Sequence, residues 1–111
     1  MPSTPDESHY MQRVAEAFRR IEDALEEVDS SDVDLDSSGD VLTLTLRDGG
    51  RCVVNTQRPT RQIWLAARAS AWHFSYDDST SKWLDDKGRG EELFATLAKV
   101  VQAGSSISVA F

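Results

Sequence analysis

Nine carboxylates gathered in one short part of the chain are the residues best placed to do chemistry. No Lys or Arg occurs between Ile21 and Arg47, so this acidic segment has a charge of −9. Because the whole chain of 111 residues has a net charge of −7, the remainder sums to +2. The nine acids are Glu22, Asp23, Glu26, Glu27, Asp29, Asp32, Asp34, Asp36 and Asp40.

Carboxylate oxygens are ligands for hard cations such as Fe, Mn, Ca or Mg. The spacing of Asp32, Asp34 and Asp36 is that of a calcium-binding EF-hand loop, but Ser37 and Thr43 stand where that loop needs Gly and Glu. Ligands on an open helix face and strand cannot close into a cage, so we expect weak and poorly selective binding. The alternative is that the segment is only a solvated face that keeps the protein soluble.

Side chains suited to nucleophilic or redox catalysis are few. The sequence contains no nucleophile elbow, phosphate-binding loop, H-E-x-x-H or C-x-x-C motif. We expect His9 to lie in a frayed N-terminal region, His73 to be a polar residue on a sheet face, and Cys52 to be a small packed side chain. The sequence therefore predicts no catalytic residue.

A second informative stretch runs from Asn55 through Pro59 to Trp64. In a strand over 62–67, Ile63 and Leu65 take the core side and Trp64 points outward with Gln62. An outward Trp beside Asn and Gln side chains is typical of a protein-binding hot spot. The sequence leaves open whether a second layer or a loop covers this Trp instead.

A helix over 10–28 positions the first acids. Its apolar residues recur at spacings of four and three, which is the pattern of an amphipathic helix. These residues are Val14, Phe18, Ile21, Leu25 and Val28. The last turn would hold Glu26, Glu27 and Asp29, although the helix dipole disfavours anions there.

Alternating apolar residues and turn signals predict a run of antiparallel strands after this helix, followed by a second helix over 91–103 with Gly104 as its C-cap. Asp48-Gly49 marks a hairpin, 55–61 a connection, and 107–109 a short strand or an extended tail. The predicted strands cover 32–36, 41–46, 51–54, 62–67, 72–76 and 82–84.

This order predicts an α+β two-layer sandwich, with two helices packed on one face of an antiparallel sheet of five to seven strands. We expect a single domain over 1–111, with 1–8 as a flexible tail. A pI near 4.7 argues against nucleic-acid binding, and no apolar run is long enough for a membrane span. One cysteine and no targeting segment favour the cytoplasm.

These residues together resemble the frataxins, of the bacterial CyaY type, over nearly the whole chain from Tyr10 to Phe111. The acidic helix end followed by Asp32-Val33-Asp34 contributes to the resemblance. Its most specific part is the motif Asn55-x-Gln57-x-Pro59, followed by Gln62-Ile63-Trp64-Leu65-Ala66. The resemblance implies the same two-layer fold and an iron-binding protein of iron–sulfur cluster assembly.

By position, the resemblance implies two sites. Iron, as Fe2+ or Fe3+, would bind weakly to an acidic ridge, where other divalent cations could replace it; the ridge residues are Glu22, Asp23, Glu26, Glu27, Asp29, Asp32 and Asp34, with Asp36 at the edge. A partner-binding sheet surface falls on Asn55, Gln57, Pro59, Gln62 and Trp64. Met11 stands where some relatives have a histidine, so we expect no histidine-assisted metal site there.

The resemblance also implies partners. The protein would act on a cysteine desulfurase and an iron–sulfur scaffold protein, as an iron chaperone or as an iron-dependent regulator of the desulfurase. We expect a monomer, or oligomers formed with iron, and a chaperone or regulator rather than an enzyme. The alternative function is that of a ferroxidase or an oligomeric iron-storage protein.

Overall fold

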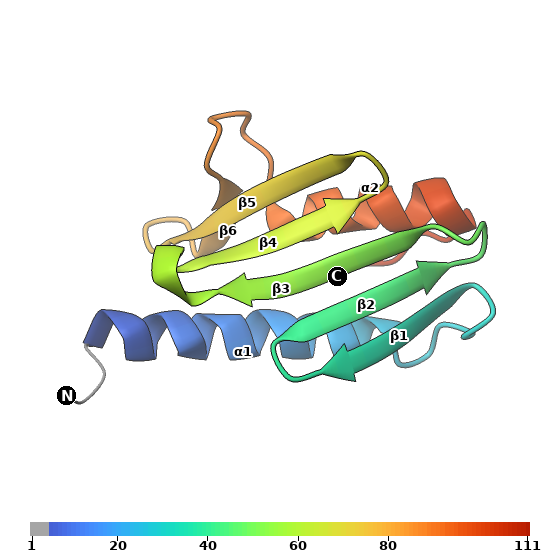
Figure 1. Cartoon of the computed structure of the whole chain (residues 1–111), viewed down its shortest axis with the longest axis horizontal. Helices are drawn as coiled ribbons and strands as arrows, with labels where there is room; N and C mark the ends of the chain where they lie inside the picture. The colour runs from blue at the N-terminus through green and yellow to red at the C-terminus, as the bar shows by residue number, and fades with distance from the viewer. Residues whose placement is uncertain (1–4) are drawn as a thin grey trace.

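The computed structural model describes residues 5–111, which form two helices and six strands in two layers (Figure 1). The elements are α1 (Pro5–Leu25), β1 (Val33–Ser38), β2 (Val41–Leu46), β3 (Arg51–Gln57), the 3-10 turn η1 (Arg58–Thr60), β4 (Gln62–Ala67), β5 (Ser70–Asp77), β6 (Lys82–Asp85) and α2 (Leu93–Ser105). The predicted α+β sandwich is confirmed, with six strands in the sheet.

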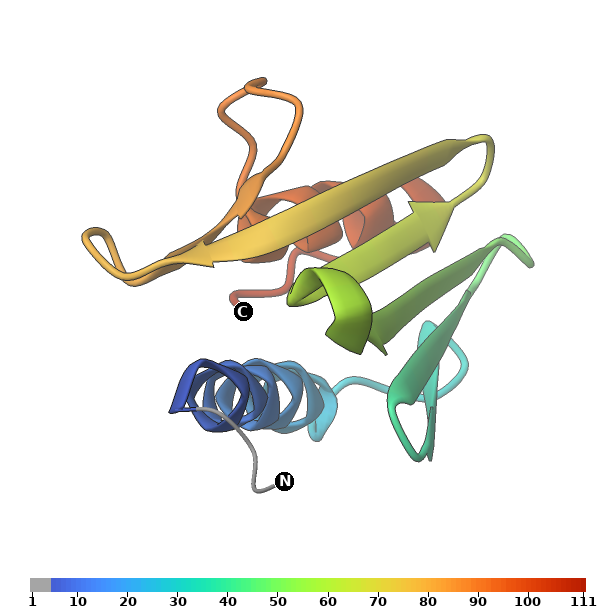
Figure 2. The ribbon, with the colours of Figure 1, turned by 60° about the vertical axis from the view of Figure 1, so that its left-hand side comes forward.

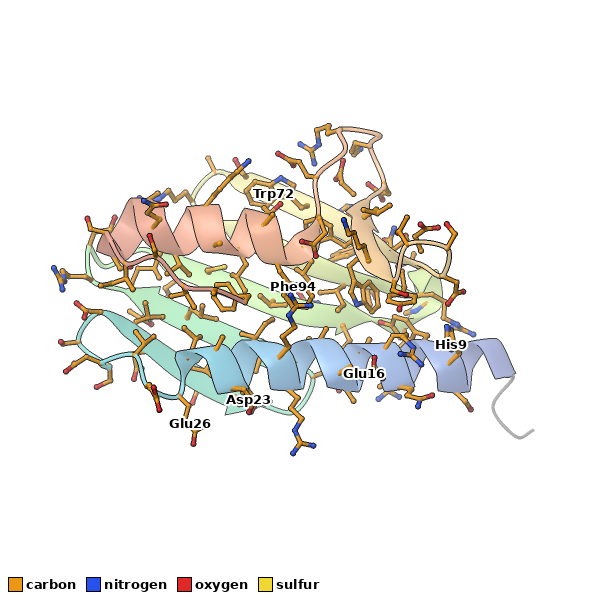
Figure 3. All side chains as sticks on the ribbon, turned by 180° about the vertical axis from the view of Figure 1, so that it is seen from behind. His9, Glu16, Asp23, Glu26, Trp72 and Phe94 are labelled. Atoms are coloured by element: carbon orange, nitrogen blue, oxygen red, sulfur yellow. The ribbon has the colours of Figure 1, made fainter. Side chains whose placement is uncertain are left out.

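The sheet is an antiparallel meander in which every strand pairs with its neighbours in the sequence, in the order β1 to β6. Both helices cover one face, as Figure 3 shows from the helix side, and no described element covers the other face. We call this second face the open face. Alternation along β2 places Leu42, Leu44 and Leu46 in the core and leaves Val41, Thr43 and Thr45 half-buried on the open face.

The first helix differs from its predicted range at both ends. It begins at Pro5, so residues 5–8 are helical rather than part of a tail, and residues 1–4 lie outside the described part of the chain. It ends at Leu25, because the backbone hydrogen bonds that follow span three residues instead of four. The N–H of Glu26 donates to the carbonyl of Asp23 (3.3 Å), and the N–H of Val28 donates to the carbonyl of Leu25 (3.1 Å). Glu26, which was predicted in the last helical turn with Glu27 and Asp29, therefore lies in a turn beyond the helix.

The predicted connection over 55–61 is also wrong in part, since β3 continues to Gln57 and only residues 58–60 form a turn. Strand pairing explains the extension, because Asn55 stands opposite Trp64 and Gln57 opposite Gln62. Residues 106–111 form no strand and lie between the helices as an extended tail, with the Arg20 Nε donating to the Phe111 carbonyl at 2.6 Å (Figure 2).

Gly104 is not the C-cap of the second helix. The left-handed residue is Ser106, with φ of 62°, and the helix begins at Leu93, capped by the Glu92 carboxylate that accepts the N–H groups of the first turn. Gly104 instead lies inside α2, where an added Cβ would collide with the Leu46 side chain. The glycine therefore permits close packing of α2 on the sheet. Neither helix is long and apolar enough to cross a membrane over the described residues.

Candidate functional site

The acidic segment is carried by three consecutive elements at one edge of the molecule. Glu22 and Asp23 lie on the last turn of α1, Glu26 and Glu27 in the following turn, and Asp34 on β1. Since β1 is the edge strand of the sheet and contacts α1, the helix end and the strand are neighbours in space. Asp23 and Glu26 point away from the sheet in Figure 3.

Most carboxylates of the acidic segment are exposed and make no ion pair or hydrogen bond within the described part of the chain. The alternation of β1 buries Val33 and half-buries Leu35, so Asp34 and Asp36 face outward, about 6–7 Å apart along the strand. The exposed, unpartnered acids are Glu22, Asp23, Glu26, Glu27, Asp34 and Asp36.

Two of the seven predicted iron ligands already have partners. The Asp29 Oδ1 accepts the Ser31 N–H at 2.8 Å and the Ser31 hydroxyl at 2.7 Å, and these bonds lower the pKa of the Asp29 carboxyl. Asp32 forms an ion pair with Arg47, and its side chain is only 16% exposed. Asp29 therefore stabilises the turn, and Asp32 connects the turn to the residue after β2. The other five predicted ligands remain accessible: Glu22, Asp23, Glu26, Glu27 and Asp34.

No three His, Cys, Asp or Glu side chains converge on one metal position among the side chains described for residues 7–111. The donor set is all oxygen and suits hard cations, but it is spread along an edge rather than folded around a point. Such a surface can hold a hydrated cation by charge, with few direct bonds. Weak and poorly selective cation binding at this edge stays a prediction.

The second predicted site lies on the open face. Asn55 on β3 and Trp64 on β4 are cross-strand partners, as are Gln57 and Gln62, and Pro59 is exposed in the turn that joins these strands. The five predicted partner-binding residues are thus brought together on one side of the sheet and at its end. Hairpin pairing, rather than sequence proximity alone, places them there.

Trp64 points away from the core, and its indole is half-buried by neighbours on the same face. The indole Nε1 donates to the Gln62 Oε1 at 2.9 Å. Trp72 and Trp83 lie on the helix side, with Trp83 only 2% exposed and the Trp72 Nε1 bonded to Glu91 at 2.6 Å. Trp64 is therefore the indole that the open face presents, and no second layer covers it among the described elements.

Three residues around Trp64 were not identified as site residues from the sequence. The His73 ring stacks on the indole with centroids 4.3 Å apart, and the Gln62 Nε2 donates to the Ser75 Oγ (3.2 Å) and the Asp86 Oδ2 (3.0 Å). Trp64, Gln62, His73, Ser75 and Asp86 form what we call the tryptophan cluster. Strand pairing could have placed His73 opposite Trp64, but Arg68-Ala69 between their strands carries no hairpin signal.

Gln62 is more buried than its outward position predicted, since only 9% of its surface is exposed. The indole and Asp86 occupy both ends of its amide, so the side chain is held inside the cluster. Its amide is therefore not free for a partner, and its part in a docking surface is to hold Trp64.

The remaining candidate side chains have structural roles. His9 is not frayed, because it lies within α1, contacts the Tyr76 ring edge-on and bonds to the Asp78 carboxylate at 2.7 Å. Cys52 is completely buried in the core, as predicted, and burial raises the pKa of its thiol to about 12. Neither residue belongs to the acidic segment or the tryptophan cluster.

The two-layer domain with an acidic edge and an open face has known counterparts. The family model described as a frataxin-like domain matches residues 3–106. A protein of Variovorax paradoxus named iron-sulfur cluster assembly protein CyaY is 36% identical over 109 residues, covering 94% of this chain and 96% of that protein. A protein of the same name from Pseudomonas fluorescens is 35% identical over 105 residues, covering 95% and 94%.

The fold agrees with these sequence matches. The solved structure of frataxin from Psychromonas ingrahamii, of the CyaY protein family, has a TM-score of 0.83 and 31% sequence identity, covering 93% of this chain and 94% of that one. The chain belongs to the frataxin-like family.

Proposed function

We propose that the protein binds iron on its acidic segment and acts in iron–sulfur cluster assembly, as an iron chaperone or an iron-dependent regulator of a cysteine desulfurase. Relatives similar over almost their whole length are named for cluster assembly, which supports the process. The observation that carries the iron role is the row of exposed carboxylates at the α1–β1 edge, which have no partner among the described residues.

The negative charge of this edge favours binding of both cations and basic protein surfaces. Two like charges about 7 Å apart in water repel by roughly 0.6 kcal/mol, so a bound cation or a basic protein surface relieves the repulsion. Iron and a basic desulfurase surface then compete for, or share, the same carboxylates. In this way the iron concentration would control the contact with the desulfurase.

The open face supplies the second contact. We assign it to the scaffold protein, because an outward Trp that stands opposite the uncharged Asn55 and stacks on the His73 ring suits a shape-specific interface. The acidic segment and the open face lie on different parts of the fold, so one molecule can contact both partners in the cytoplasm. The assembly would then bring iron, sulfur donor and scaffold together.

The experiment compares two triple variants with the same net charge. In the first, Glu26→Gln, Glu27→Gln and Asp34→Asn remove three charges from the acidic segment. In the matched control, Gln12→Lys, Ala69→Lys and Gln102→Lys add three positive charges at exposed positions elsewhere. Binding to the desulfurase is measured by calorimetry at 0.15 M salt, and desulfurase activity is measured with and without Fe2+ under anaerobic conditions.

We expect the acidic-segment variant to bind the desulfurase at least about tenfold more weakly, which corresponds to about 1.4 kcal/mol. In this variant, the effect of Fe2+ on desulfurase activity should be lost as well. The control should keep most of the affinity, because its changes lie outside the contact. Equal binding by the wild type and the acidic-segment variant would exclude this edge as the desulfurase site.

Nothing in the described residues favours the ferroxidase or iron-storage alternative, since no three metal-ligating side chains converge. A di-iron oxidase uses paired carboxylates and Glu-x-x-His motifs that project into one cavity. Aerobic oxidation of Fe2+ faster than an iron-only blank would revive this alternative.

A further inference from the structure

Asp86 reaches the open face from the loop that follows β6. Its N–H donates to the carbonyl of His73 at 2.9 Å, and its Oδ2 accepts from the Gln62 Nε2 at 3.0 Å. The His73 Nδ1 lies 3.5 Å from the same oxygen. One carboxylate therefore contacts both residues that touch the Trp64 indole, although it is 22 positions away from Trp64 in the sequence.

The loop that carries Asp86 is anchored from the opposite face of the sheet. The Asp85 side chain is 0% exposed and accepts the N–H groups of Lys87 (3.1 Å) and Arg89 (3.4 Å) together with the Arg89 guanidinium (2.8 and 3.0 Å). The loop projects from the end of β6 in Figures 1 and 2. Its first residue, Asp86, is thus held in place by the buried anchor beside it.

Which groups donate and which accept in these hydrogen bonds determines how Asp86 acts on Gln62. A glutamine amide has an oxygen that accepts and an NH2 group that donates, and rotation by half a turn exchanges them. An indole N–H only donates, so Gln62 holds Trp64 only when its oxygen faces the indole. An ionised carboxylate only accepts, so Asp86 stabilises the amide orientation in which the NH2 group faces Asp86 and the oxygen faces Trp64.

We propose that Asp86 is a positioning residue of the open face, which sets the Gln62 amide and thereby holds the Trp64 indole in the orientation presented to a partner. The inference rests on the proposed function in taking the scaffold protein as that partner. The side chain of Asp86 is 32% exposed, so it stands beside the interface rather than within the core. His73 completes the arrangement by covering one side of the indole.

The test uses variants that differ in hydrogen-bond polarity. Asp86→Lys replaces an acceptor by a donor, Asp86→Ala removes it, and Asp86→Asn keeps a carbonyl oxygen that can still accept from Gln62. Asp78→Lys is the matched control, because it makes the same charge change in the β5–β6 turn, where Asp78 contacts His9 and not the tryptophan cluster. Thermal unfolding of each variant checks that the fold is intact.

The first readout is the indole N–H signal of Trp64 in a proton–nitrogen NMR spectrum. The three tryptophans give three indole signals, and Trp64→Phe identifies the one that disappears. Asp86→Lys and Asp86→Ala should move this signal and speed its exchange with solvent, while Asp86→Asn restores it and Asp78→Lys leaves it in place. A Trp64 signal that is unchanged in Asp86→Lys overturns the proposal.

The second readout is the affinity for the scaffold protein. Asp86→Lys should weaken binding roughly tenfold, as expected for the loss of one oriented hydrogen bond, with Asp86→Asn near the wild type. A shifted indole signal with full affinity, in an assay where Trp64→Ala weakens binding, also overturns the proposal. If Trp64→Ala binds normally, the scaffold assignment of the proposed function is wrong, and the indole signal alone then decides whether Asp86 positions Trp64.

Discussion

The acidic segment and the tryptophan cluster are organised in opposite ways. Along the acidic edge, six carboxylates are exposed and make no ion pair or hydrogen bond among the described residues. In the tryptophan cluster the polar side chains are linked to one another by hydrogen bonds, from the indole N–H through the Gln62 amide to Asp86. One region carries charge without fixed geometry, and the other carries fixed geometry with little charge.

This difference indicates two modes of recognition in a small fold. Charge acts over about 8 Å at physiological salt, so the acidic edge can attract partners and hold hydrated ions without a shaped site. A fixed aromatic side chain acts only in contact, and its hydrogen bonds reduce the entropy lost on binding. We expect the acidic edge to control the rate and salt dependence of association, and the cluster to control specificity.

The largest effect expected at the two surfaces is stabilisation by a cation, which should act through the acidic edge only. If Mn2+ or anaerobic Fe2+ binds the folded chain alone, a concentration of 100 times its Kd should raise the free energy of unfolding by roughly 2.7 kcal/mol. Urea unfolding at constant ionic strength measures this, with the Glu26→Gln, Glu27→Gln, Asp34→Asn variant as control. Equal stabilisation of that variant would place the bound cation elsewhere.

The anchor of the tryptophan cluster should matter more for folding than any acid at the edge. Asp85→Asn removes the charge that holds Arg89 and two loop N–H groups, and we expect a loss of about 2 kcal/mol in urea unfolding. Glu22→Gln serves as the comparison, since that carboxylate is exposed and unpartnered. Similar losses in both variants would mean that the two regions are not organised differently.

The ionisation of Asp85 should also make the stability of the protein depend on pH. The Arg89 guanidinium lowers the pKa of the Asp85 carboxyl from 3.8 to about 2. A carboxyl with a lowered pKa in the folded state stabilises the protein above its ordinary pKa, and this contribution is lost as the pH falls toward 2. Stability measured from pH 5 to pH 2 should therefore fall less steeply in Asp85→Asn, and parallel curves would contradict this assignment.

A smaller effect is expected at the open face. Trp64→Ala removes a half-buried side chain and one hydrogen bond to Gln62, so the loss of stability should be about 1 kcal/mol. Trp83→Ala provides the contrast, because that indole is 2% exposed and its removal should cost about 3–5 kcal/mol. A comparable loss at Trp64 would show that it belongs to the core rather than to a docking surface.

The smallest effect should be a slight gain. Glu22→Gln and Glu26→Gln, each tested alone, relieve repulsion between neighbouring charges and should raise stability by about 0.5 kcal/mol or less. The gain should shrink in 0.5 M NaCl, because salt screens exposed charges. A loss in low salt would reveal a structural partner for these carboxylates.

Much of the fold follows from local patterns in the sequence. The strands over Val41–Leu46 and Gln62–Ala67 were predicted with their observed bounds, because alternation marks the first and a short apolar run between polar residues marks the second. The end of α1 at Leu25 was missed because the apolar spacing continues to Val28 although the hydrogen bonding changes after Leu25. The role of Gly104 was missed because it depends on the contact of α2 with Leu46. A glycine near a helix end has the same sequence signal whether it caps the helix or admits a neighbouring side chain.

In the candidate site, too, some features follow from the local sequence and others depend on tertiary contacts. The acidic segment is readable from the sequence because its charges are contiguous, and the outward direction of Trp64 follows from strand parity. The Asp32–Arg47 pair and the reach of Asp86 to Gln62 could not be predicted, because each joins residues that only strand pairing or a loop brings together.

The burial of Cys52 has a practical consequence. Its thiol is completely buried and has a pKa near 12, so it is almost entirely protonated at neutral pH and shielded from reagents. As the chain contains no other cysteine, a cysteine introduced on the surface would be the single reactive thiol. Spin labels or dyes could then be attached at Ser37 beside the acidic edge or at Ala66 on the open face, in an otherwise unmodified protein, to follow each surface separately as partners bind.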